Sequence, residues 1–99
     1  MARRGRFTRD EFGRAVEALM HDTGTTYRAL AERTGLSAGY LNHLVHGNRP
    51  VPSNEVIATL AKALGVEPDH FAEVRVRAVT EKLAVMPDLT DRLYKRYGT

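Results

Sequence analysis

The chain has 99 residues, of which 42% are hydrophobic, and this length suits one small domain. It contains no Cys, which excludes disulfides, thiol nucleophiles and Cys-based metal centres. The uncharged runs are too short to span a bilayer, and the basic N-terminus lacks the apolar segment of a secretory signal. We therefore expect a cytoplasmic protein that does not bind membranes.

The positive charge is unevenly distributed along the chain. The net charge is +3, and all of this excess lies in residues 1–49. Residues 33–54 contain no Asp or Glu but include two Arg and two His. A surface without carboxylates suits a polyanion, because each phosphate contact displaces condensed counterions. Chance clustering in a mildly basic protein would give the same distribution, so charge alone does not decide between the two.

The first expected element is a basic N-terminal arm, residues 1–7, followed by a helix start. Thr8 and Glu11 match a capping box, and Phe7 and Phe12 match the hydrophobic staple that accompanies it. Apolar residues at helical spacing then predict a first helix from this box to about residue 21.

Three further helices are predicted from Ser or Thr at the N-cap and Gly immediately after the end. They cover residues 27–34, 37–46 and 53–64. The expected caps are Thr25 or Thr26, Ser37 and Ser53, and the expected stops are Gly35, Gly47 and Gly65.

The remaining residues predict two more helices. Residues 68–86 read as one helix with Pro68 in its first turn, and Pro87 separates it from a short helix that carries Leu89, Leu93 and Tyr97. No stretch alternates between polar and apolar residues for long enough to predict a sheet. The fold class expected is all-α.

The spacing of residues 27–46 indicates a helix-turn-helix. Two helices that cross steeply through a short turn need a small residue at their contact, a Gly in the turn and an apolar residue to fill the corner. Ala31, Gly35 and Leu36 occupy these positions. Leu41 and Leu44 would anchor the second helix against the first. The sequence therefore predicts a compact helix bundle containing a helix-turn-helix.

Residues 12–71 resemble the lambda-repressor-like (Cro/CI-type, XRE) helix-turn-helix family. The resemblance lies in L-A-E-R-T-G-L-S, in Y-L-N-H-L-V-H-G-N-R-P-V-P and in A-K-A-L-G-V. It implies a helical domain that binds duplex DNA as a dimer, mostly in transcriptional repressors. It divides the chain into the basic arm (1–7), a DNA-binding domain (8–71) and a C-terminal helical extension (72–99).

The resemblance also implies a set of contacts, with residues 37–46 forming the helix in the major groove. The implied base contacts are Ser37, Ala38, Gly39, Asn42 and His43. The implied phosphate contacts are Thr26, Tyr27, Arg28, Tyr40, His46, Asn48 and Arg49. The basic residues Arg3, Arg4 and Arg6 either reach a neighbouring groove or form a solvated tail. Because Ala38 and Gly39 offer little to base edges, DNA shape is expected to carry part of the selectivity.

Several of these side chains have simpler interpretations. Tyr40 could pack against the preceding helix instead of contacting DNA. His43 and His46 have a spacing that could hold a metal, but no Cys or nearby carboxylate completes a site, so no metal or cofactor is expected. His21 and His70 are expected at the surface or at helix ends. No constellation of catalytic residues stands out, so an enzyme is not expected.

Residues 71–86 carry apolar side chains on two nearly opposite helix faces, whereas a surface helix needs one apolar stripe. The first face comprises Phe71, Val74, Ala78 and Val85, and the second comprises Ala72, Val76, Val79, Leu83 and Met86. We predict C-terminal dimerisation helices whose twofold interface covers the second face. The expected interface residues are Val76, Val79, Leu83, Met86, Leu89, Leu93 and Tyr97. The alternative is a monomer in which the last helix folds back over this face.

The sequence thus predicts a sequence-specific regulator of transcription that binds double-stranded DNA as a homodimer and acts as a repressor. One alternative is an antitoxin, which binds a toxin through its C-terminal helices and represses its own operon. A second alternative is a protein-interaction module that has the fold without DNA binding.

Overall fold

The computed structural model describes residues 6–98, and within this range the chain forms helices and turns without a β-strand. The helices are α1 (Phe12–Thr23), α2 (Tyr27–Thr34), α3 (Ala38–Val45), α4 (Asn54–Leu64), the 3₁₀ turn η1 (Pro68–His70), α5 (Ala72–Ala84) and α6 (Pro87–Tyr97). The predicted all-α class is confirmed. None of these helices is both long enough and apolar enough to cross a membrane.

One hydrophobic core holds α1–α4 and η1 together. It is built from the apolar faces of these elements, and full burial of each large apolar side chain contributes about 1.5–3 kcal/mol. Its largest fully buried side chains are Phe12, Val16, Leu30, Leu41, Ile57, Leu60 and Phe71. The rings of Phe12 and Phe71 lie 4.8 Å apart between centroids, so the start of α1 is packed against the end of η1.

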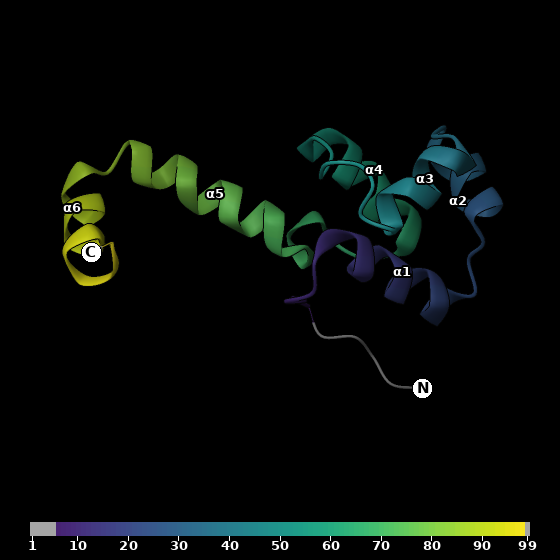
Figure 1. The fold of residues 1–99 in the computed structure, drawn as a ribbon, viewed down its shortest axis with the longest axis horizontal. Helices are drawn as coiled ribbons and strands as arrows, with labels where there is room; N and C mark the ends of the chain where they lie inside the picture. Colours follow the sequence, from purple (N-terminus) through teal and green to yellow (C-terminus); the bar gives the residue numbers. More distant parts are fainter. Residues whose placement is uncertain (1–5, 99) are drawn as a thin grey trace.

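α5 leads away from this core, and α6 turns at its far end (Figure 1). The chain is therefore elongated, with principal extents of 47 × 29 × 21 Å. α5 packs against η1 and α6, and no residue of α5 or α6 is fully buried. α1–α4 and η1 form the compact bundle, while the C-terminal extension projects from it.

The predicted capping box at the start of α1 is wrong. The Thr8 hydroxyl accepts from the N–H of Asp10 at 3.2 Å, and the Thr8 N–H donates to the carbonyl of His70 at 2.9 Å. Because that N–H is already bonded, Glu11 has no partner to reach back to. The cap comes from another helix instead, since the Phe12 N–H donates to the Glu73 carboxylate at 3.1 Å.

The predicted staple is wrong as well. Phe7 is 54% exposed, and its ring lies under the Arg75 guanidinium, 4.5 Å from the centroid. A cation held over an aromatic face is electrostatically favourable, so this pair replaces the expected contact between Phe7 and Phe12.

The predicted continuous helix over residues 68–86 is broken at Phe71. This residue is extended, with φ −85° and ψ 130°, between η1 and α5. The break sends the Phe71 ring into the core and leaves the His70 carbonyl available to Thr8. His70 is consequently buried rather than at the surface, and its Nδ1 donates to the carbonyl of Arg6 at 2.8 Å.

Gly13 marks the closest approach of α1 to α3. A Cβ placed on Gly13 would lie 2.6 Å from the carbonyl oxygen of Val45 and 2.8 Å from that of Leu44. Both atoms belong to the backbone, so neither can move aside without shifting a helix. The absence of a side chain here lets α1 support the C-terminal end of α3.

Gly13→Ala is expected to lower the free energy of unfolding by about 1–3 kcal/mol, the usual effect of overpacking a close contact. Gly39→Ala is the matched control, because Gly39 is also helical but a Cβ there meets nothing within 4 Å. The control should raise stability by up to about 1 kcal/mol through helix propensity. Urea unfolding of both variants measures the difference, and equal midpoints would contradict the assigned contact.

Candidate nucleic-acid interface

The corner between α2 and α3 is built by local hydrogen bonds and by one left-handed residue. Gly35 has φ 78°, which residues with a side chain rarely adopt, and its N–H donates to the carbonyl of Ala31 at 2.8 Å. The Thr34 hydroxyl accepts from the Leu36 N–H at 3.2 Å, and Leu36 packs against the core. The predicted turn therefore forms through the residues that the sequence indicated.

α3 is anchored on one side and open on the other. Leu41 and Leu44 are buried, and the Ser37 hydroxyl caps the helix by accepting from the Tyr40 N–H at 3.0 Å. The residues implied to face base edges are all exposed: Ser37, Ala38, Gly39, Asn42 and His43. Since a hydroxyl can donate while it accepts, the cap does not prevent Ser37 from contacting a base.

The N-terminus of α2 presents the first group of implied phosphate contacts. The Thr26 hydroxyl accepts from the Ala29 N–H at 3.1 Å. Partial burial, and to a lesser degree the charge of Glu17, raises the pKa of the Tyr27 hydroxyl above its usual range, so the phenol stays a neutral donor. Arg28 is exposed and lies 3.8 Å from Glu32, an ion pair weak enough to leave its guanidinium able to contact phosphate.

The second group of implied phosphate contacts lies along α3 and the loop after it. Tyr40 is half-buried and packs against the core, which matches the simpler interpretation of this side chain. His46 follows α3 and its Nδ1 donates to the Asn42 carbonyl at 2.8 Å, which leaves Nε2 for an outside partner. Asn48 and Arg49 are exposed. No Asp or Glu occurs between Arg33 and Asn54, so α3 and the loop after it contribute no negative side chain to this face.

Arg6 has a protein partner in η1, 63 residues away in the sequence. Its guanidinium donates to the Asp69 carboxylate at 2.9 Å, and this bond, with the carboxylate's charge, raises the pKa of Arg6 above its usual range. The bond ties Arg6 to η1, so a contact between Arg6 and DNA would have to compete with it. Arg3 and Arg4 lie outside the described residues.

The predicted dimer residues divide into two groups. Val76, Val79, Met86 and Tyr97 are exposed, with Val76 at 63% and Val79 at 55%. Leu83, Leu89 and Leu93 are half-buried where α5 and α6 pack together. The Thr90 hydroxyl closes this corner by donating to the carbonyls of Leu83 at 2.6 Å and Met86 at 3.0 Å. α6 therefore covers only the far end of α5, and it leaves Val76 and Val79 open to solvent.

Sequence reasoning missed the side chains that join α5 to the bundle. These are Glu73, Arg75 and Arg77, and each of them bonds a backbone group or side chain far away in the sequence. Nothing local in the sequence marks them, because charged residues near a helix start read as a solvated face. Across residues 6–98, no group of three or more His, Cys, Asp or Glu side chains is placed to hold a metal ion.

Comparisons with known proteins agree with this geometry. A family described as a helix-turn-helix domain matches residues 11–74. The crystal structure of the clp gene regulator ClgR from Corynebacterium glutamicum is similar, with a TM-score of 0.54 and 32% sequence identity over 88% of this chain and 90% of that one. No curated protein sequence matched this chain. On the extent of the family match and of this similarity, the chain belongs to the helix-turn-helix domain family.

Proposed function

We propose that this chain is a sequence-specific regulator of transcription. It binds double-stranded DNA as a homodimer and represses transcription of the genes that it controls. The observation that carries the proposal is the exposed N-terminal half of α3, which lies in a stretch of chain without a carboxylate. The helix-turn-helix family and the similarity to a gene regulator support DNA binding by a protein that is not an enzyme.

In this proposal, α3 enters the major groove. Asn42 can pair with adenine through two hydrogen bonds, His43 can make one, and the Ala38 methyl suits the methyl group of thymine. The absence of a side chain at Gly39 allows the α3 backbone to approach the bases closely. Around this centre, Arg28 and Tyr27 meet one strand, while His46, Asn48 and Arg49 meet the other.

The homodimer follows from the apolar surface that the single chain leaves open. Val76 and Val79 lie about one turn apart on α5, and Met86, at the start of α6, and Tyr97, at its end, are also exposed. Exposed apolar side chains grouped in this way mark an interaction surface. A twofold axis through it would bring two α3 helices onto one face of the duplex, about 34 Å apart. Occupancy of such a site would exclude polymerase, which is the mechanism of repression that we propose.

Two substitutions distinguish residues that contribute to overall DNA affinity from residues that determine which DNA sequence is preferred. Arg49→Ala should weaken binding to every duplex alike. It should also lower the slope of log affinity against log salt concentration by about one, the value for one lost phosphate contact. Asn42→Ala should lose about 1–3 kcal/mol at one base pair and change which sequences bind best. Selection of bound duplexes from a random pool, followed by affinity titrations at several salt concentrations, measures both effects.

Arg92→Ala is the control for these variants, because it removes the same charge from an exposed position on α6. It should leave the selected sequence unchanged. If the native chain shows no salt-dependent binding to any duplex, the interpretation as an interaction module without DNA binding replaces this proposal.

A further inference from the structure

The connection between the bundle and α5 is very short. Only Phe71 separates η1 from α5, and it is extended rather than helical. A residue has two soft backbone dihedrals, so such a link would by itself let the extension swing. What fixes the direction of α5 must therefore be side-chain contacts beyond this link.

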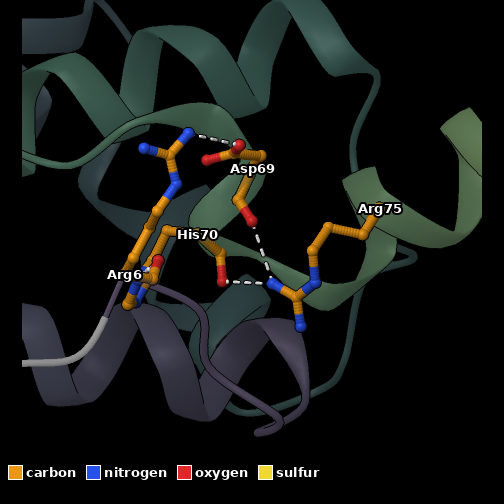
Figure 2. A network of polar contacts seen from close by, with 4 residues as sticks. All are labelled: Arg6, Asp69, His70 and Arg75. Carbon is orange, nitrogen blue, oxygen red and sulfur yellow. Dashed lines mark hydrogen bonds and ion pairs between the residues drawn. The ribbon is translucent and has the colours of Figure 1, made fainter.

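Arg75 holds α5 from one side. Its guanidinium donates to the carbonyls of Asp69 at 2.9 Å and His70 at 2.8 Å, as Figure 2 shows, and to the carbonyl of Thr8 at 2.6 Å. One planar group thus bonds three carbonyls from two separate segments. Because its donors form a rigid fork, the three bonds define an orientation and not only a distance.

Glu73 and Arg77 hold α5 from the other side. They are four residues apart and share one face of the helix, whereas Arg75 lies half a turn away from both. The Glu73 carboxylate accepts from the first N–H of α1 at 3.1 Å. Arg77 donates to the carbonyl of Pro52 at 2.9 Å and to the side-chain oxygen of Asn54 at 2.7 Å. We call Glu73, Arg75 and Arg77 the polar clamp.

Two residues of the polar clamp bond segments that adjoin α3 in space or in the chain. Glu73 bonds the start of α1, where Gly13 lies against the last carbonyls of α3. Arg77 bonds Pro52 and Asn54, between which the loop from α3 passes into α4. The direction of α5 is therefore fixed relative to the same elements that fix the direction of α3.

We propose that the polar clamp sets the spacing between half-sites at which two copies can bind DNA together. This rests on the proposed dimeric DNA binding. A clamped extension holds the two α3 helices at one separation and one rotation, whereas a swinging extension would tolerate several. Inserting one base pair moves a half-site by about 3.4 Å and rotates it by about 34°, so a rigid dimer should discriminate sharply.

The test is a set of duplexes in which selected half-sites are moved apart or together by one base pair at a time. The native chain should lose about tenfold or more in affinity for a shift of two base pairs, because the duplex or the protein must deform. Arg75→Ala and Arg77→Ala should flatten this profile while the sequence of each half-site stays the same. Arg92→Ala, with the same loss of charge, should keep the native profile. A sharp profile that both clamp variants retain would overturn the proposal.

A second measurement does not need DNA. The chain has no Cys, so spin labels can be placed at Arg14→Cys on α1 and Glu81→Cys on α5, both exposed positions. The labelled chain is mixed with an excess of unlabelled chain, so that each measured distance lies within one molecule. The native background should give one narrow distance distribution, and Arg77→Ala should broaden it. Equally narrow distributions would overturn the clamp even if the chain fails to bind any duplex.

Discussion

Val79→Asp is expected to separate the proposed dimer into single chains and to lower affinity for a palindromic operator by about 100-fold or more. Val79 is 55% exposed, so a carboxylate there remains solvated in the single chain and does not disturb its fold. In the proposed dimer the same carboxylate would be buried in an apolar interface, which is strongly unfavourable. The loss of affinity follows because two linked α3 helices bind DNA with about 10²–10⁴-fold higher affinity than one.

Analytical ultracentrifugation and operator titration measure this result together. Ala78→Asp is the matched control, since Ala78 is an exposed neighbour that lies on another face of α5. It should leave both the assembly and the affinity unchanged. A native chain that sediments as a monomer at micromolar concentration would contradict the dimer. Purification with a second protein in equal amount would favour the antitoxin alternative.

Phe71→Ala is expected to lower the free energy of unfolding by about 3–5 kcal/mol, the usual range for a buried Phe. The ring is fully buried and lies 4.8 Å from that of Phe12, so its removal leaves a cavity between α1 and η1. A domain of this size has a total stability of roughly 5–15 kcal/mol, and the variant would thus retain little of it. Thermal unfolding followed by circular dichroism gives the change.

Val85→Ala is the control for this substitution. Val85 is 73% exposed on the C-terminal extension, and truncation of a surface side chain typically changes stability by less than about 0.5 kcal/mol. If Phe71→Ala were no more destabilising than Val85→Ala, the Phe71 ring could not be what packs η1 against α1.

The helix-turn-helix could be predicted from the sequence because its determinants are local. Thr26 and Ser37 each bond an amide three residues away, and Gly35 adopts its left-handed conformation within the turn itself. Such interactions lie within a few residues, where spacing and residue type carry the information. Asn42 and His43, which the family resemblance assigned to base contacts, are exposed.

The sequence-based predictions were wrong where contacts between segments distant in the sequence determine the local structure. The cap of α1 comes from Glu73, 61 residues away, so the local pattern of Thr8 and Glu11 pointed to the wrong partner. The periodicity of residues 68–86 is helical throughout, but burial of Phe71 and His70 against the start of the chain breaks it. Gly13 shows its role only when α3 is brought beside it.

If the open apolar side chains on α5 form the proposed dimer, the level of expression of the chain would have a steep effect on DNA binding. In a chain that reads DNA as a pair, scarce copies are mostly unpaired, so the number of pairs grows with the square of the copy number. Operator occupancy would then rise steeply over a narrow range of expression. A modest change in synthesis or degradation would suffice to turn the controlled genes on or off.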